Sequence, residues 1–322
     1  MLLSPAVTLE DGVSLEAVRF PGGDNELCGT LTMPSSSTDT AVLFSHGWSG
    51  NRTGPHGLLR HLAQALASEG LPSLRFDFAG RGESRGNGLD VSLATQSADL
   101  EAAAHYLRRR TNATRLLLLG ICSGGNVIIG TLPRLPQPCG MILLSVYPFS
   151  DGDTFSRSAN RTLHFAKVYW HKLWRRDTWA RCLRGELDFG QILHVLFGHF
   201  KDRGKSRAPV EASATAAPGR VNRPAGEEGR TTSAPPTRHL HKLKSGVPAL
   251  MIYGGSDPDA GPARSYYESF AREHDLPVEF RELAGANHNF SSCEWTQTVV
   301  EETLSFCRKT AGTPPQPLSS AG

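Results

Sequence analysis

The sequence predicts an α/β fold, in which a mostly parallel β-sheet carries helices on both of its faces. From residue 41 onward, short apolar segments of strand length alternate with longer segments whose apolar residues recur at helical spacing. A length of 322 residues accommodates one large domain of this class and an insertion. Ligands of such sheets bind where the parallel strands end, so functional residues are expected in the loops that follow strands.

Each expected element has a local reason. Residues 13–33 predict an antiparallel hairpin at a sheet edge, because two strand-like segments flank a Pro-Gly-Gly turn. Compact apolar runs predict buried strands, which are expected at 41–44, 74–78, 116–121, 141–146, 247–253 and 277–283. Apolar residues at helical spacing predict helices at 55–69, 92–110, 262–274 and 295–308, with one more opening after residue 125. Ser92 is expected to cap the helix at 92–110, and Gly70 to end the helix at 55–69.

A long interval separates the two parts of this alternation. Residues 151–200 are rich in Trp, Tyr and Phe and predict a helical lid over the strand ends. Residues 201–240 contain few large apolar side chains, which cannot bury enough surface to offset the entropy of ordering, so a disordered linker is expected. The tail at 311–322 is expected to be disordered for the same reason. The core domain is then formed by residues 1–150 and 245–310.

Composition excludes several classes of protein. The net charge of +3 is too small for a nucleic-acid-binding signature, and the N-terminus shows neither the basic start nor the apolar run of a signal peptide. No apolar run reaches transmembrane length. The six cysteines are scattered, which is unlike a disulfide framework or a metal-binding motif. We therefore expect a cytoplasmic protein without metal or cofactor.

The segment 116–125 is the one around which the chain is organised. An apolar strand ends at Gly120, Cys122 follows two residues later, and Gly124 follows after two more. This is the strand–turn–helix pattern of a nucleophile elbow, in which a strained central residue projects its side chain above the sheet. Side chains two residues away on either side would crowd that turn, which explains the glycines. The helix that follows directs its N-terminus at the nucleophile and lowers the pKa of a cysteine there.

There are two alternatives to a nucleophilic Cys122. Ser123 would be the nucleophile if the elbow were centred one residue later, but bulky Ile121 would then occupy a flank that requires a small residue. A buried, inert thiol is a common role for cysteine. The rest of the chain favours the nucleophile, because it supplies a matching acid and histidine.

The acid and the histidine follow the last two predicted strands. Asp257 lies in Gly-Gly-Ser-Asp after one strand, and His288 lies in Gly-Ala-Asn-His after the next. The order Cys122, Asp257, His288 is the nucleophile–acid–histidine order of a known class of catalytic triad. Asp259, Asp151 and Asp153 are alternative acids. The backbone N–H groups of Trp48 and Ser123 are the expected oxyanion donors, because one donor follows the nucleophile and the other lies in the His-Gly-Trp loop.

These motifs together resemble the α/β-hydrolase superfamily, in particular its serine-aminopeptidase-like lipase and esterase branch. The resemblance covers residues 15–150 and 245–308 and includes the Asp77–Ser84 segment, to which it assigns a structural role. The Gly285–Phe290 segment also resembles hydrolases associated with exosortase systems. The branch has serine at the elbow where this chain has Cys122, whereas dienelactone hydrolases and polyhydroxyalkanoate synthases have a similar cysteine elbow.

The resemblance and the residues together predict a hydrolase that acts on a carboxylic ester or thioester through an acyl-thioenzyme. An acyltransferase with the same triad is an alternative, as is a non-catalytic binding module on the same scaffold. Hydrolysis of carbon–carbon bonds also occurs on this fold. The expected partner is a small acyl substrate. The aromatic residues of the lid favour an apolar one, and the excess of basic residues at 157–207 favours an anionic substrate or a membrane surface.

Overall fold

The computed structural model describes residues 6–9, 11–88, 91–136, 138–148, 242–243 and 246–311. The chain divides into two units, one made of Met1–Asp151 with Ala234–Gly322 and the other of Gly152–Ser233. Every residue of the second unit lies outside the described ranges. The predicted lid and linker also lie outside them, as do the alternative acids Asp151 and Asp153.

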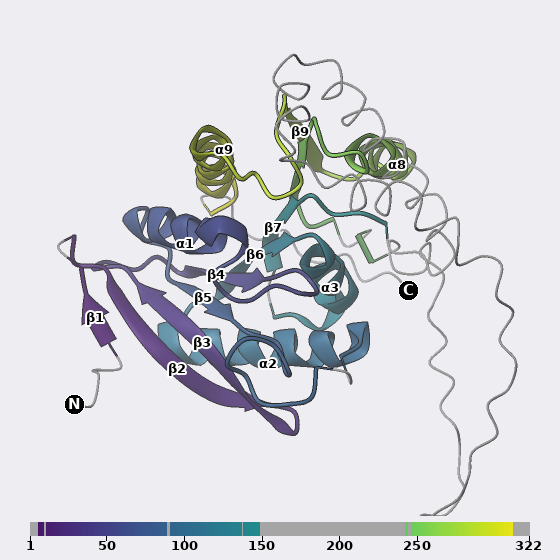
Figure 1. Cartoon of the computed structure of the whole chain (residues 1–322). Helices are drawn as coiled ribbons and strands as arrows, with labels where there is room; N and C mark the ends of the chain where they lie inside the picture. The colour runs from purple at the N-terminus through teal and green to yellow at the C-terminus, as the bar shows by residue number, and fades with distance from the viewer. Residues whose placement is uncertain are drawn as a thin grey trace, which may run out of the picture. The chain divides into compact units, whose positions relative to one another are not determined.

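A nine-stranded sheet forms the centre of the first unit, with the strand order β1-β2-β3-β5-β4-β6-β7-β8-β9 (Figure 1). The strands are β1 (Ala6–Thr8), β2 (Ser14–Gly22), β3 (Asn25–Met33), β4 (Thr40–Ser45), β5 (Ser73–Phe76), β6 (Arg115–Ile121), β7 (Pro138–Leu144), β8 (Ala249–Gly254) and β9 (Val278–Leu283). The first three strands pair antiparallel, and β3 pairs antiparallel with β5. All pairs from β5 to β9 are parallel. The predicted hairpin and the predicted mostly parallel sheet are both confirmed.

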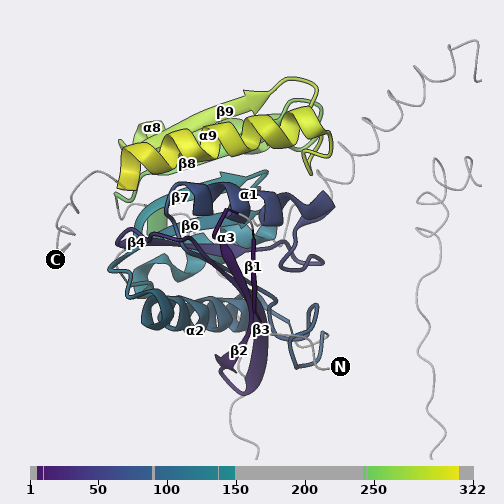
Figure 2. The same ribbon diagram turned by 90° about the vertical axis from the view of Figure 1, so that its left-hand side faces the viewer.

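Helices cover both faces of this sheet. The helices α1 (Leu58–Ser68) and α9 (Cys293–Ala311) pack on one face, where their apolar residues join those of β4, β6 and β7. The helices α2 (Leu93–Thr111), α3 (Ser123–Thr131) and α8 (Ala260–Glu273) pack on the other. Figures 1 and 2 show α1 beside α9 and, across the sheet, α2 beside α3. Single 3-10 turns, η1 (Pro55–Gly57) and η2 (Leu132–Arg134), adjoin α1 and α3.

Some predicted boundaries were wrong. The strand predicted at 141–146 begins at Pro138, because parallel pairing with β6 extends it, and ends at Leu144. The helix predicted at 295–308 is longer, since α9 reaches Ala311 and the carbonyl of Thr310 accepts a hydrogen bond of 2.8 Å from Arg115. Residues 312–322 of the predicted tail lie outside the described residues. The short exposed strand β1 was not predicted.

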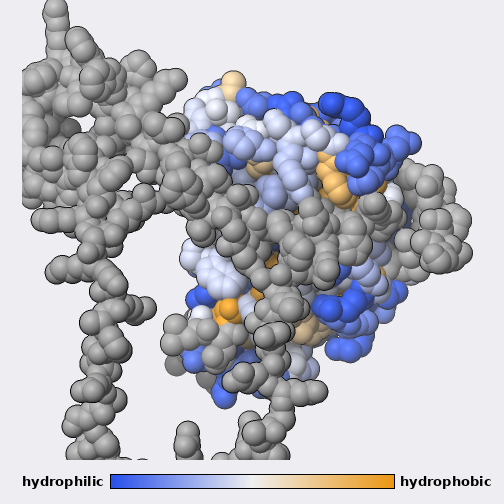
Figure 3. All heavy atoms as spheres, turned by 90° about the vertical axis from the view of Figure 1, so that its right-hand side faces the viewer, coloured by the Kyte–Doolittle hydropathy of each residue, from blue (hydrophilic) through white to orange (hydrophobic). Residues whose placement is uncertain are grey.

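The predicted N-cap of α2 is confirmed. The Ser92 side chain accepts from the backbone N–H of Thr95 at 3.1 Å, and the Thr95 hydroxyl accepts from the backbone N–H of Ser92 at 2.9 Å. These reciprocal bonds satisfy two donors at the helix start. None of the described helices is long and apolar enough to cross a membrane. On the face drawn in Figure 3, the described residues are mainly hydrophilic, with small separate hydrophobic areas.

Candidate active site

The turn between β6 and α3 holds Cys122 in a strained conformation. Its backbone has φ 54° and ψ −128°, a left-handed value of φ that residues with a side chain rarely adopt. The turn is held from two sides, because the Cys122 N–H donates to Leu144 O at 2.8 Å and the Gly125 N–H donates to Cys122 O at 3.1 Å. Cys122 is partly exposed. A residue kept in such a conformation by its surroundings is a typical sign of a functional site.

The glycines on either side of Cys122 are required by close contacts. A Cβ atom on Gly124 would lie 2.2 Å from the carbonyl oxygen of Ser45, at the end of β4. A Cβ atom on Gly120 would lie 2.8 Å from the Cα atom of Gly125. The Ser45 hydroxyl donates to Gly124 O at 2.9 Å and ties the end of β4 to the start of α3. The crowding expected from the sequence is therefore present, and it comes from the neighbouring strand as well as from the turn.

The loops after β8 and β9 bring Asp257 and His288 together. The Nδ1 atom of His288 lies 2.8 Å from Asp257 Oδ2, and the other carboxylate oxygen of Asp257 accepts from the Asp259 N–H at 3.2 Å. The Ser145 hydroxyl donates to the backbone carbonyl of His288 at 2.9 Å and fixes the loop. The side chain of Asp257 is 4% exposed, whereas that of His288 is 30% exposed. The carboxylate is therefore buried behind an imidazole that solvent can reach.

His288 also connects to the elbow. Its side chain forms a hydrogen bond with that of Cys122, so the three predicted side chains stand in one hydrogen-bonded series. Burial by itself lowers the pKa of His288, but the hydrogen bonds and negative charges of Asp257 and Cys122 outweigh it and raise the pKa to about 9. Burial alone would raise the pKa of Asp257, and the hydrogen bonds from His288 and Tyr147 lower it overall. These surroundings favour the imidazolium form of His288.

Sequence reasoning missed Tyr147. Its hydroxyl contacts Asp257 Oδ2 and lies 2.5 Å from His288 Nδ1. Its ring stacks on that of His288, with centroids 5.2 Å apart and planes 20° apart. Tyr147 follows β7 just as Asp257 follows β8, so its place after a parallel strand was the signal that could have revealed it.

The expected oxyanion donors lie beside the elbow, and one of them has a partner. Gly47 faces the elbow closely enough that a Cβ atom on it would lie 3.5 Å from Cys122 Cβ. The Trp48 N–H donates to the Ser123 hydroxyl at 2.6 Å. The sequence predicted a free Trp48 N–H aimed at the substrate. In the structure this N–H donates to the Ser123 side chain, on the elbow.

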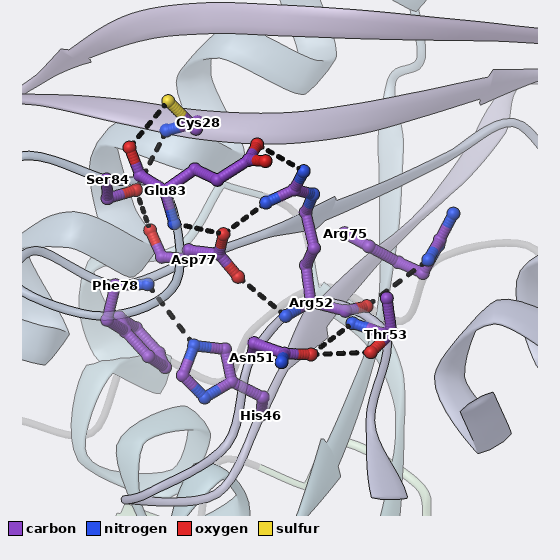
Figure 4. Close-up of polar contacts among 10 residues, drawn as sticks. All are labelled: Cys28, His46, Asn51, Arg52, Thr53, Arg75, Asp77, Phe78, Glu83 and Ser84. Atoms are coloured by element: carbon purple, nitrogen blue, oxygen red, sulfur yellow. Dashed lines mark hydrogen bonds and ion pairs between the residues drawn. The ribbon is translucent and has the colours of Figure 1, made fainter. Parts of the chain in front are cut away.

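The loop that carries Trp48 is fixed by His46. The Phe78 N–H donates to His46 Nε2 at 3.2 Å (Figure 4). His46 Nδ1 lies 2.7 Å from Gly47 O. A carbonyl oxygen only accepts, so Nδ1 carries the proton and the ring is neutral. Burial lowers the pKa of His46 and favours the same neutral form. His46 thus joins the loop after β4 to the loop after β5.

A second link between these loops is the buried carboxylate of Asp77 (Figure 4). It accepts from the backbone N–H of Arg52 at 2.6 Å and from that of Glu83 at 3.0 Å, and it pairs with the Arg52 guanidinium. The guanidinium also reaches Glu83 at 2.5 Å. The Ser84 hydroxyl donates to Asp77 O at 2.6 Å. This network supports the structural role that the resemblance assigns to residues 77–84.

The residues that the structure describes include no group of three or more His, Cys, Asp or Glu side chains able to hold a metal ion. At the elbow the side chains supply a partly exposed thiol, an imidazole and a buried carboxylate in one series. Such a series is suited to nucleophilic catalysis followed by proton transfer.

Comparisons with known proteins agree with the fold. The model of the serine aminopeptidase family S33 matches residues 36–188. No curated protein matches the chain.

Several solved structures are similar over nearly the whole chain. A dienelactone hydrolase from Anabaena variabilis is 16% identical with a TM-score of 0.55, and the match covers 92% of this chain and 97% of that one. The esterase Pf2001 from Pyrococcus furiosus is 18% identical with a TM-score of 0.59, covering 92% of both chains. Est1E from Butyrivibrio proteoclasticus, solved with ferulic acid bound, is 14% identical with a TM-score of 0.55, covering 92% of this chain and all of that one. At these identities the likeness concerns the fold.

Proposed function

We propose that the chain is a hydrolase of the α/β-hydrolase superfamily, whose fold it shares. In this proposal it cleaves a carboxylic ester or thioester with Cys122 as nucleophile, His288 as proton carrier and Asp257 as the group that orients His288. The observation that carries this proposal is the series Asp257–His288–Cys122, which ends on a strained elbow at the N-terminus of α3. An inert cysteine has no need of such partners or of such a backbone conformation.

The resting state of this site is a thiolate beside an imidazolium. His288, with a pKa of about 9, holds its proton at neutral pH, and the partners that favour this form are Asp257 and Cys122. The N-terminus of α3 adds its partial positive charge next to the thiolate. In this proposal the thiol proton is on His288 before the substrate binds.

Acylation follows from this resting state. The Cys122 thiolate attacks the carbonyl carbon, an S–C bond forms, and the carbonyl electron pair moves to oxygen. When the tetrahedral intermediate collapses, the bond from carbon to the leaving alcohol or thiol oxygen or sulfur breaks, and that atom takes the proton from His288. Asp257 stabilises the imidazolium and holds its Nδ1–H in place throughout.

Deacylation reverses the roles with water. His288, now neutral, takes a proton from a water molecule, and the resulting hydroxide attacks the acyl-thioenzyme. The S–C bond breaks, the thiolate returns to Cys122 and the carboxylic acid leaves. An alcohol, amine or thiol that replaced water here would make the same site an acyltransferase, so the product formed with an added acceptor distinguishes the two activities.

The negative oxygen of each intermediate requires donors. The backbone N–H of Ser123 at the start of α3 is one, and the backbone N–H of Trp48 is the other. Because the Trp48 N–H is bonded to the Ser123 hydroxyl at 2.6 Å, binding of a substrate oxygen there first requires rotation of that hydroxyl.

The first test is the reactivity of Cys122. We expect a small iodoacetamide-type reagent to label Cys122 rapidly at pH 6–7, well below the ordinary thiol pKa of about 8.5. Peptide mapping after brief treatment measures the rate at each cysteine, and exposed Cys293 on α9 serves as an internal reference. The label should be absent from the elbow peptide in Cys122→Ala and form more slowly in His288→Ala.

A second arm follows the acyl group. Mass spectrometry of the protein quenched during turnover of an activated aryl ester should show one acyl group, on Cys122. Labelling of Cys122 no faster than of Cys293, without acylation, would overturn the nucleophile and favour a binding module on a hydrolase scaffold.

A further inference from the structure

Hydrogen bonds from α3 and from β8 hold the backbone at Tyr147. Its backbone carbonyl accepts from Asn126 Nδ2, on α3, at 3.0 Å. The carbonyl of the preceding residue, Val146, accepts from the hydroxyl of Tyr253, on β8, at 3.0 Å. Tyr147 is only 7% exposed, and its ring lies against that of His288. These contacts fix the Tyr147 side chain beside His288.

The hydroxyl of Tyr147 lies between the carboxylate and the imidazole. A phenol has one proton to donate, and an ionised carboxylate only accepts, so the proton is shared with Asp257 Oδ2. The phenol oxygen is then available to accept from the Nδ1–H of His288, from which it lies 2.5 Å away. The same Nδ1 lies 2.8 Å from Asp257 Oδ2, so the three groups form a closed triangle.

We propose that Tyr147 is a positioning residue of the proposed site, whose hydroxyl bridges Asp257 and His288 and holds His288 in the tautomer and orientation that direct its other nitrogen at Cys122. This inference rests on the proposed function, because it concerns the same proton transfer. It adds a fourth side chain that acts through His288 and does not itself contact the substrate.

The charges around the Tyr147 hydroxyl keep it protonated, which is the form that can donate to Asp257. The titratable groups that act on it are Asp257, Cys122 and Asp259, together with His288, which it contacts. Burial raises the pKa of Tyr147 far above its ordinary value, and the negative charge of Asp257 raises it further. The phenol therefore keeps its proton at neutral pH.

The test compares two variants that each remove one buried phenol hydroxyl. Tyr147→Phe keeps the ring that stacks on His288 and loses the bridge. Tyr267→Phe removes a phenol hydroxyl that is also buried, on α8, and serves as the control. Hydrolysis of an activated aryl ester is measured across the pH range for both and for wild type, and thermal unfolding is recorded alongside.

For Tyr147→Phe we expect kcat to fall about tenfold with KM unchanged, since a hydrogen bond to a charged group is lost in the transition state. The acidic limb of kcat/KM should move up by about one pH unit, because Asp257 loses a donor that lowers its pKa. The downfield proton NMR signal of the His288 Nδ1–H should shift as well. Tyr267→Phe should keep the wild-type pH profile and NMR signal.

The outcomes separate this inference from the proposed function. If wild-type Cys122 is acylated as expected and Tyr147→Phe matches wild type in kcat and pH profile, the bridging role is overturned and the proposed function stands. Equal shifts in both Phe variants would also overturn it, because they would reflect packing. If Cys122 is not acylated in wild type, it is the proposed function that fails.

Discussion

At the elbow, the Ser123 hydroxyl occupies a backbone donor that the proposed mechanism assigns to the substrate. The positive φ of Cys122 directs its side chain away from the strand, and the close approach of Ser45 leaves room only for glycine at 124. The next residue, Ser123, uses its hydroxyl to accept from the Trp48 N–H at 2.6 Å. In the proposed mechanism, a substrate carbonyl oxygen and this hydroxyl compete for one donor.

Removal of the hydroxyl should relieve that competition. Ser123→Ala leaves the Trp48 N–H free to bind the substrate oxygen, so we expect kcat/KM for an activated aryl ester to rise about threefold to tenfold, the equivalent of one ordinary hydrogen bond. Steady-state kinetics measure the change. Thermal unfolding controls for damage to the start of α3. A loss of activity of tenfold or more would contradict this expectation and would indicate that the hydroxyl itself donates to the substrate oxygen.

The sequence predicted which side chains meet but not how they are bonded. Cys122, Asp257 and His288 follow strands that end at one edge of a parallel sheet, and strand ends are readable from apolar runs. Tyr147 occupies a similar place, yet nothing in a sequence separates an aromatic residue that faces a site from one that packs in the core. The partner of the Trp48 N–H depends on one side-chain rotamer of Ser123, which local sequence does not determine.

At the scale of elements, ion pairs and a hydrogen bond connect two loops at the edge of the sheet where the site lies. The loop after β4 carries Trp48, and the loop after β5 carries Asp77 and Glu83. The guanidinium and backbone N–H of Arg52 connect the first loop to the second (Figure 4). The order of β4 and β5 in the sheet makes the two loops neighbours, and the buried carboxylate of Asp77 fixes their spacing. The position of one proposed oxyanion donor thus depends on an ion pair remote from the reacting atoms.

Removal of the Asp77 charge should affect both stability and activity. Asp77→Asn leaves the Arg52 guanidinium short of its buried partner, so we expect the free energy of unfolding to fall by about 3 kcal/mol. We also expect kcat to fall while labelling of Cys122 persists, because the Trp48 loop loosens and the elbow does not. Urea unfolding and steady-state kinetics give the two numbers.

The matched control is Glu26→Gln. Glu26 pairs with Arg19 at 3.0 Å, but both side chains are exposed, so the expected loss is below about 1 kcal/mol. Equal losses in the two variants would show that the Asp77 pair has no special role.

Element boundaries show the same division between what local sequence determines and what pairing determines. The antiparallel hairpin and the cap of α2 follow from turn residues and from Ser92, which act locally. The start of β7 at Pro138 and the whole of β1 depend on which strand lies alongside. Three exposed residues, Ala6–Thr8, carry no apolar pattern, so only their partner strand makes them a strand.

At the scale of the whole molecule, buried ionisable groups make the stability of the first unit depend on pH. Burial raises the pKa of Asp99, on α2, to about 6, although its carboxylate accepts from the Ala79 N–H at 2.9 Å. Burial lowers the pKa of His46. The stabilisation associated with Asp99 is complete below the ordinary pKa of 3.8 and is lost as the pH rises through about 6. His46 acts in the opposite sense, since stability is lost as the pH falls below its ordinary pKa of 6.5.

The contribution of Asp99 can be isolated with Asp99→Asn, whose side-chain oxygen still accepts from the Ala79 N–H but carries no charge at any pH. Urea unfolding of wild type and variant at pH 4, 6 and 8 measures the difference in free energy of unfolding. We expect the variant to gain on wild type as the pH rises, by up to about 3 kcal/mol at pH 8, since a shift from 3.8 to about 6 corresponds to that energy. The effect of His46 cancels because both proteins contain it. A difference that stays constant from pH 4 to pH 8 would mean that Asp99 ionises in the folded protein as it does in the unfolded chain, and that the packing of α2 against the loop after β5 imposes no cost on its charge.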